Sequence, residues 1–326
     1  MITGERIAGV LNILLVTFPF FALVLGGFVA ARRRMLPLEA IPGLNSFVLY
    51  FALPAMLFRF GSTTPIAQLL DASVFGVYLL CALIMVGFAI AMTKGGRIGW
   101  NDASMGALVA AFPNTGFMGV PLLAALLGPQ SAGPVIVLIV VDMVVTSSLC
   151  IALSRLDGGE GGAAAAAGKA LSGVVRNPMP WAIILGAAAS ALQFTLPAPI
   201  EKTVWLLADA ASPVALFTIG AVLARSQMQA DHPMPLGDYV PVAVMKLVLH
   251  PVLVLLAGSA AIQLGVPLSQ FALTVMVLVA ALPSASNVSL LAERFGADNG
   301  RIARIILVST ALAFFTFSGA VTLMRG

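Results

Sequence analysis

The sequence predicts an all-α polytopic membrane protein, with ten transmembrane helices in a 5+5 inverted repeat and with broken, crossing helices four and nine. Three observations support this class. Of the 326 residues, 60% are hydrophobic and 9% are charged, whereas a soluble domain carries about 25% charged residues. Apolar stretches long enough to cross a bilayer recur along the whole chain. Two of these stretches, one in each half, carry matching interruptions.

The number of spans follows from the length of apolar sequence that a bilayer requires, which is about 20 residues per helix. The ten segments are 7–31, 38–60, 72–92, 103–127, 133–154, 178–197, 203–225, 239–264, 269–293 and 302–324. Residues 1–155 form a first five-helix repeat, 156–177 a flexible cytoplasmic linker rich in Gly and Ala, and 178–326 a second five-helix repeat. Because five is an odd number, the second repeat enters the membrane in the opposite orientation, as in many secondary transporters.

The basic residues predict which loops are cytoplasmic. If the amino terminus is outside, the cytoplasmic loops hold twelve Lys and Arg residues, the outer side holds four, and Lys246 remains inside a span. The positive-inside rule therefore predicts that both termini lie outside. The cytoplasmic group is Arg32, Arg33, Arg34, Lys94, Arg97, Arg155, Lys169, Arg176, Arg225, Arg294, Arg301 and Arg304. This distribution explains the net charge of +4 without a nucleic-acid partner.

Boundary signals justify several of the spans. Span one ends in Arg32-Arg33-Arg34, which is typical of a stop signal rather than of a signal-peptide cleavage site. Asp71 and Asn101-Asp102 precede spans three and four and are predicted to cap those helices. Span two (YFALPAMLFRFGS) aligns loosely with span seven (DAASPVALFTIGA), with proline opposite proline, which supports the repeat.

The matching interruptions lie in spans four and nine, in VAAFPNTGFMGVP (109–121) and VAALPSASNVSLLAERFG (279–296). Proline lacks an amide hydrogen and clashes with the preceding turn, so Pro113, Pro121 and Pro283 are predicted to break these helices. The freed backbone groups cannot face lipid. They are therefore expected to meet at mid-membrane and line a cavity, where the amino-terminal ends of the half-helices would favour an anion.

The candidate substrate-binding residues are the polar side chains beside these breaks and the glycines that permit a close approach. They are Asn114, Thr115, Gly116, Gly119, Ser284, Ser286 and Asn287. An alternative is that both sites are simple kinks, stabilised by Ser, Thr and Asn as in many membrane helices. The occurrence of a matched pair in the two halves favours the binding site.

The residues around the interruptions resemble those of the auxin efflux carrier family, in particular its bacterial members. The resemblance rests on FPNTGFMGVPLL, LPSASNVSLLAERFG, YFALPAMLF and ASPVALFTIGAVLA, and it covers essentially the whole chain. In span nine the pattern P-x-A-x-N-x-x-x-L-A-x-x-[FY]-G is matched by Pro283, Ala285, Asn287, Leu291, Ala292, Phe295 and Gly296.

This resemblance implies a crossover of spans four and nine at the substrate site. It also implies a transport domain that moves past a scaffold (spans one, two, six and seven) in an elevator-like way, with each domain built from both halves, often in a homodimer. Bacterial members are often assigned to malonate, malate or other small carboxylates. The central loop is short, without room for the phosphorylated regulatory domain of the plant branch. This departure weakens auxin as the natural substrate.

Four ionisable residues in the spans are candidates for ion coupling or for sensing the charge of the substrate: Asp142, Lys246, Asp209 and His250. An ionisable side chain at mid-bilayer costs at least about 2.5–3.5 kcal/mol, so it normally faces a cavity or a partner. Alternatives stay open for each. Asp142 and Lys246 form a structural ion pair, or Lys246 reaches the membrane interface. His250 bonds only to backbone, and Asp209 caps a helix or lies in a loop.

The predicted function is secondary active transport of small organic anions such as malonate or malate across the inner membrane of a bacterium. No motif of a hydrolase, metalloprotease or nucleotide-binding enzyme is present, so we expect no enzyme activity, no cofactor and no metal, and a proton or sodium gradient must supply the energy. Cys81 and Cys150 have neither ligand nor disulfide spacing. Two alternatives are a sodium-coupled carrier of larger amphipathic anions and a membrane sensor that binds a ligand without transporting it.

Overall fold

The protein is nearly all helical in a computed structural model that describes residues 2–69, 71–156, 168, 172, 175, 177–228 and 234–325. In these residues there are isolated β-bridges but no strands. Seven helices are long and apolar enough to cross a membrane. Shorter apolar helices cover Thr115–Leu127, Pro178–Ala191 and Gln270–Ala280. The predicted all-helical membrane class is therefore confirmed, whereas its division into ten spans in two repeats stays a prediction.

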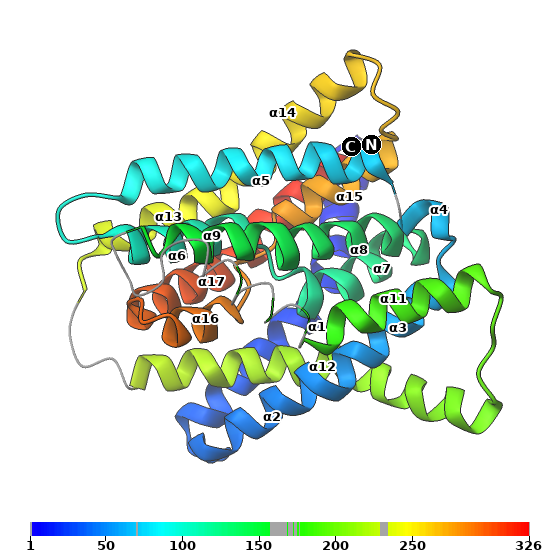
Figure 1. The fold of residues 1–326 in the computed structure, drawn as a ribbon, viewed down its shortest axis with the longest axis horizontal. Helices are drawn as coiled ribbons and strands as arrows, with labels where there is room; N and C mark the ends of the chain where they lie inside the picture. Colours follow the sequence, from blue (N-terminus) through cyan, green and yellow to red (C-terminus); the bar gives the residue numbers. More distant parts are fainter. Residues whose placement is uncertain are drawn as a thin grey trace.

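The helices can be followed along the chain in Figure 1. The first part contains α1 (Ile2–Arg32), α2 (Ile41–Phe47), α3 (Leu53–Thr63), α4 (Ile66–Leu69), α5 (Ala72–Thr93), α6 (Trp100–Ala111), α7 (Val120–Leu127), α8 (Ala132–Val140) and α9 (Ser147–Leu153). The second part contains α11 (Pro178–Ala191), α12 (Ala198–Met228), α13 (Val240–Val244), α14 (His250–Gln263), α15 (Gln270–Ala280), α16 (Val288–Arg294) and α17 (Asn299–Arg325).

Short segments of tighter or wider helix connect several of these elements. The 3-10 segments are η1 (Leu38–Ala40), η4 (Pro129–Ser131) and η6 (Leu236–Asp238). The π-helical segments are η2 (Val48–Ala52), η3 (Thr115–Gly119), η5 (Val141–Thr146) and η7 (Met245–Leu249). Single π turns inside α-helices occur frequently at functional sites. Here η5 contains Asp142 and η7 contains Lys246, so two of the predicted ionisable residues lie on such turns.

Helices α1 and α12 pack with their backbones in close contact. A Cβ atom added to Gly27 of α1 would lie 1.8 Å from the carbonyl oxygen of Phe217 in α12. A Cβ atom added to Gly220 of α12 would lie 1.8 Å from the carbonyl oxygen of Val24 in α1. Small residues at a helix contact allow such an approach in membrane proteins. The two helices therefore form one closely packed unit.

Helices α3 and α11 form a second pair of the same kind. Gly61 of α3 and Gly186 of α11 face each other, and a Cβ atom on Gly186 would lie 2.7 Å from the carbonyl oxygen of Phe58. Helix α12 also packs against α3, which joins the two pairs into one group.

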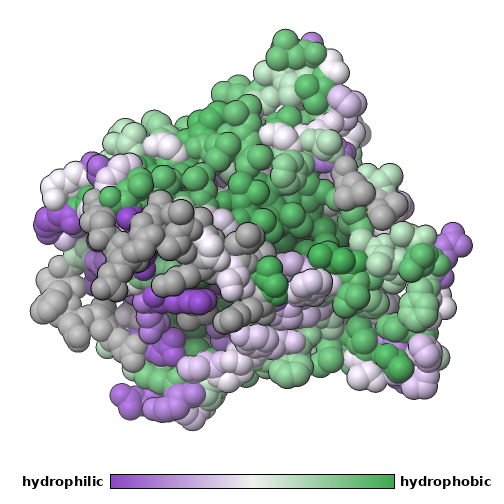
Figure 2. Space-filling view, in the orientation of Figure 1, coloured by the Kyte–Doolittle hydropathy of each residue, from purple (hydrophilic) through white to green (hydrophobic). Residues whose placement is uncertain are grey.

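Most of the remaining helices form a second group around α5, α6, α8, α15 and α17, although α2 packs against α12 and α17 also packs against α1. Helix α5 contacts α6, α8 and α14, and α15 contacts α8, α14 and α17. Figure 2 shows apolar residues across the middle of the visible face, whereas hydrophilic residues gather mostly toward the left, where α12 ends. A broad apolar belt of this kind fits a protein whose solvent is largely lipid.

The two predicted helix caps have different outcomes. The Asp71 carboxylate accepts hydrogen bonds from the backbone N–H groups of Ser73 and Val74 at 2.9 and 3.0 Å, so the predicted cap of α5 is confirmed. Asp102 does not cap α6, whose N-cap residue is a glycine. Instead the Asp102 carboxylate accepts the N–H of Asp298 at 2.7 Å. The partner of this carboxylate lies in a segment that is distant in the chain, so the local sequence could not predict the contact.

Candidate functional site

The two proline-containing stretches lie against each other inside the protein. Residues 112–114 separate α6 from η3, and residues 281–287 separate α15 from α16. One residue from each stretch, Pro113 and Ser284, forms an isolated antiparallel β-bridge. We call residues 112–114 and 281–287 together the crossing segments.

Two backbone hydrogen bonds hold the crossing segments together. The N–H of Asn114 donates to the carbonyl of Pro283 at 2.8 Å, and the N–H of Ala285 donates to the carbonyl of Phe112 at 2.9 Å. A net hydrogen bond contributes about 0.5–1.5 kcal/mol, but an unpaired buried group costs more. Each bond therefore satisfies groups that the end of a helix would otherwise leave free in an apolar interior.

Several polar groups of the crossing segments remain unused. Asn114 and Asn287 occupy the N-cap positions of η3 and α16, but neither side chain makes a capping bond, although asparagine is a preferred cap. The hydroxyl of Ser284 is buried without a partner. The backbone N–H groups of Ser286 and Asn287 make no hydrogen bond to any described residue. These amide and hydroxyl groups are thus left without a partner among the described residues.

The other predicted residues of this region divide by role. The Thr115 hydroxyl donates to the carbonyl two residues earlier at 3.3 Å, so it has a local partner. Gly119 allows close packing, because a Cβ there would lie 2.8 Å from Leu282 of the opposite segment. A Cβ on Gly116 would make only ordinary contact. Pro121 was predicted to break the helix and does not: it lies in the first turn of α7, and helix is continuous over Thr115–Leu127.

Asp142 is fully buried beside α5. Its carboxylate accepts a hydrogen bond from the Tyr78 hydroxyl at 3.0 Å and a longer one from the Thr146 hydroxyl at 3.4 Å. The Ser147 hydroxyl donates to the backbone carbonyl of Asp142 at 2.8 Å, which the wider π turn permits. Tyr78 is a polar partner that the sequence analysis missed. A tyrosine inside an otherwise apolar span was the available signal.

Lys246 is also fully buried, and its contacts lead to the crossing segments. The ammonium group donates to the carbonyl of Ala280 at 2.6 Å and contacts Nδ1 of His250 at 3.0 Å. Ala280 is the last residue of α15. The Tyr78 and His250 rings lie 6.0 Å apart. The Lys246 ammonium therefore binds the carbonyl of the last residue of α15.

These contacts overturn three of the alternatives. Lys246 does not reach the membrane interface, because it is 0% exposed. It makes no direct ion pair with Asp142. The ion pairs in the described part of the chain are Arg59–Asp209 and Arg97–Asp238. His250 contacts a side chain rather than backbone alone, and its Nε2 is buried without a partner. We call Tyr78, Asp142, Lys246 and His250 the buried cluster.

Asp209 does not belong to the buried cluster. It lies within α12, so it neither caps a helix nor lies in a loop. Its carboxylate pairs with Arg59 of α3 at 2.7 Å, and the two side chains are 68% and 37% exposed. The Arg59 guanidinium also lies over the Trp205 ring, 5.5 Å from its centre. This contact joins α12 to α3 at the surface.

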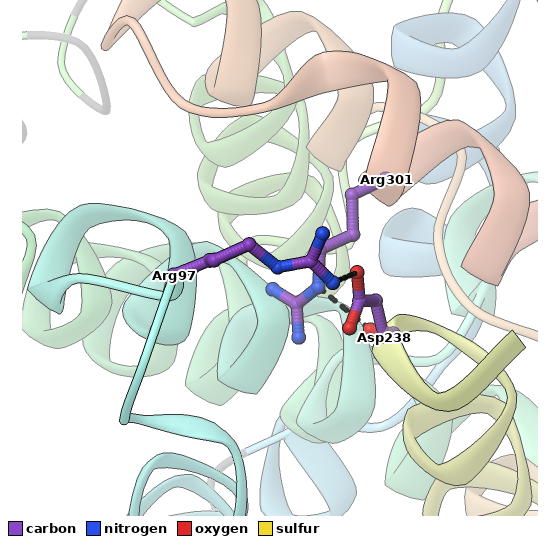
Figure 3. Close-up of polar contacts among 3 residues, drawn as sticks. All are labelled: Arg97, Asp238 and Arg301. Carbon is purple, nitrogen blue, oxygen red and sulfur yellow. Dashed lines mark hydrogen bonds and ion pairs between the residues drawn. The ribbon is translucent and has the colours of Figure 1, made fainter. Parts of the chain in front are cut away.

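A second polar network missed by the sequence analysis links the segment before α13 to the loop between α5 and α6, to α6 itself and to α17; Figure 3 shows Arg97, Asp238 and Arg301 of this network. Arg97 pairs with the Asp238 carboxylate at 2.9 Å. Arg301, only 2% exposed, donates to the backbone carbonyls of Asp238 and Asp102 at 2.7 and 2.8 Å. All these arginines were placed on the cytoplasmic side by their positions in the sequence. The network therefore connects loops predicted to lie on one side of the membrane.

The sequence of this chain is similar to those of known membrane transporters. Residues 13–321 match the family described as "Membrane transport protein". The chain belongs to this family, which is the auxin efflux carrier family that the sequence resembles. It is thus a membrane transporter rather than an enzyme.

Three relatives illustrate the range of the family. The chain is 34% identical to a "Putative malonate transporter" of Rhizobium meliloti (strain 1021), over 94% of both chains. It is 28% identical to an "Uncharacterized transporter" of Escherichia coli (strain K12), over 85% of this chain and 86% of the relative. It is 22% identical to "Auxin efflux carrier component 8" of Arabidopsis thaliana, over 64% of this chain and 71% of the relative.

Proposed function

We propose that this member of the family is a secondary active transporter of small organic anions, and that the anion binds at the crossing segments. One observation carries the proposal: at two adjacent helix ends, the Asn114 and Asn287 side chains make no capping bond and the Ser284 hydroxyl is buried without a partner in the described residues. Malonate or malate would suit these amide and hydroxyl donors. The name of the Rhizobium relative supports malonate as the first substrate to test.

The packing supports the proposed inverted repeat. Helix α1 opens the first half and packs on α12, the second long helix of the second half. Helix α11 opens the second half and packs on α3, which belongs to the second span of the first half. A two-fold relation between the halves exchanges these two pairs. Both pairs are closely packed through glycine contacts, which suits a stationary scaffold. The second group of helices would then be the moving domain of an elevator-type transporter.

The buried cluster is the proposed site of ion coupling or of sensing substrate charge. Lys246 bonds the last carbonyl of α15, so a change in its protonation or position acts directly on a crossing segment. Asp142→Asn is expected to abolish the pH dependence of uptake. Asp209→Asn is the control, because Asp209 is exposed and lies outside the buried cluster. Unchanged pH dependence in Asp142→Asn would contradict this role.

The substrate proposal is tested by counterflow of radiolabelled malonate and malate in proteoliposomes, together with binding to the purified protein. Asn114→Ala and Asn287→Ala should each weaken binding by about 10- to 100-fold, because hydrogen bonds to a charged group contribute about 1.5–3 kcal/mol. Asn45→Ala in α2 is a matched control that removes an amide outside the crossing segments.

The outcomes separate the proposal from its alternatives. Wild-type binding in both asparagine variants would remove the crossing segments from the site. Ligand binding without counterflow would indicate a sensor. Uptake that requires sodium and favours larger amphipathic anions would indicate the alternative sodium-coupled carrier of such anions. We propose that the protein lies in the inner membrane of a bacterium and forms a homodimer there.

A further inference from the structure

The carbonyl end of α15 is an electronegative point inside the protein. The last carbonyls of an α-helix have no partner within the helix, and the helix dipole places about half a negative charge there. Ala280, Ala281 and Leu282, at the end of α15 and just beyond it, are at most 1% exposed. The carbonyls of Ala281 and Leu282 accept no hydrogen bond from any residue that the structure describes. A buried helix end of this kind is stabilised by a cation.

Lys246 supplies that cation. Its ammonium group donates to the Ala280 carbonyl at 2.6 Å, a short distance that is typical of a charged donor. The side chain is 0% exposed, and Nδ1 of His250 lies 3.0 Å from the same nitrogen and orients it. Lys246 makes no ion pair within the described part of the chain. The ammonium therefore bonds a helix end and not a carboxylate.

Sodium ions bind to the same kind of group in other transporters with interrupted helices. In such proteins unwound carbonyls and the carbonyl ends of half-helices coordinate the sodium ion, whereas the amino-terminal ends of half-helices face the anionic group of the substrate. Both kinds of helix end meet here, because α15 ends before the crossing segments, and η3 and α16 begin after them. In this chain the carbonyl end already holds a positive charge that belongs to a side chain.

We infer that the Lys246 ammonium is a built-in cation that replaces a coupling sodium ion, so that the protein binds its organic anion without sodium. This inference rests on the proposed function, in which the anion binds at the crossing segments. Ala280 directly precedes residues 281–287, so the charge lies beside the proposed substrate site and favours a negative ligand there. Lys246 is thus a positioning residue, which acts on the substrate through the end of α15.

The first test is binding of radiolabelled malonate to the purified full chain in a neutral detergent, with sodium, potassium or choline as the only salt cation. The dissociation constant of the wild type is expected to be the same in all three salts. Lys246→Met keeps a side chain of similar length without its charge, and it should weaken binding by about tenfold or more. Lys202→Ala is the matched control, because it removes an exposed lysine of α12.

Chemical rescue separates a required cation from a merely structural side chain. Lys246→Ala removes the atoms of n-propylammonium, so this ion is expected to restore malonate binding to Lys246→Ala. It should also raise the melting temperature of Lys246→Ala but not that of Lys202→Ala, because a ligand stabilises only the protein that binds it. Tetramethylammonium carries the charge without an N–H donor and should restore nothing.

Three outcomes overturn the inference. They are wild-type binding that requires sodium, undiminished binding in Lys246→Met, and equal rescue of Lys246→Ala by tetramethylammonium and n-propylammonium. The comparison of salts uses the wild type alone, so it tests the inference even if neither Lys246 variant folds. Absence of malonate binding and of counterflow in the wild type in every salt would instead refute the proposed function.

Discussion

Replacing Gly27 by alanine is expected to force α1 and α12 apart. A Cβ atom at this position would lie 1.8 Å from the carbonyl oxygen of Phe217, 2.7 Å from its carbonyl carbon and 3.0 Å from its Cα. All three atoms belong to backbone, so no change of side-chain rotamer relieves the contact. The carbonyl must retreat by at least about 1.6 Å before the two atoms reach an ordinary van der Waals distance.

The size of the effect follows from this displacement. Overpacking of a close contact costs about 1–3 kcal/mol, and a contact with backbone on both sides belongs at the upper end. Alanine is favoured over glycine inside a helix by about 0.5–1 kcal/mol, which offsets part of this cost. The expected net loss of stability for Gly27→Ala is therefore about 2 kcal/mol.

The adjacent glycine is the matched control. Gly26 is exposed, and a Cβ atom there would meet nothing within 4 Å. Gly26→Ala should therefore leave the protein unchanged or stabilise it by up to about 1 kcal/mol. The assay is thermal unfolding of the two variants and the wild type, purified in the same detergent. If Gly27→Ala melts at or above the temperature of Gly26→Ala, the close contact of α1 with α12 is not as described.

Four further substitutions test the two polar networks. Tyr78→Phe removes the shorter hydrogen bond of the Asp142 carboxylate, so thermal unfolding should show a loss of about 1–3 kcal/mol; an unchanged melting temperature would mean that the bond does not form. Arg301→Met should cost about 1–3 kcal/mol, because it removes two part-buried hydrogen bonds from a charged group to the backbone carbonyls of Asp238 and Asp102. Arg97→Ala should cost less than about 1 kcal/mol, since its ion pair is exposed. Asp238→Asn should match Arg97→Ala, because Arg301 binds the backbone carbonyl of Asp238; a larger loss would contradict this assignment.

Local sequence was sufficient for some features of the site. Pro113 and Pro283 each lie in a non-helical stretch that follows α6 or α15, as the loss of an amide donor predicts. The same rule was wrong for Pro121, because a proline in the first turn of a helix loses no hydrogen bond. The outcome therefore depends on where the preceding helix stops, and a single proline does not specify this.

The partners of the charged residues could not be predicted. Hydropathy showed that Asp142 and Lys246 lie within apolar spans, and a direct ion pair between them was one of the alternatives that this position left open. In the structure Asp142 binds Tyr78, whereas Lys246 binds Ala280 and His250. These contacts join elements that are far apart in the chain, so they depend on how the helices pack.

The amino-acid sequence alone determined that this chain is a helical membrane protein, because a helix surrounded by lipid must carry mostly apolar side chains. It also predicted that Pro113 and Pro283 lie where helical backbone stops, since proline acts on its own turn. Tertiary structure decided that the two interruptions touch and that Lys246 binds the carbonyl end of α15. Such contacts depend on the close approach of distant backbones, which is set by packing between helices and not by any one segment.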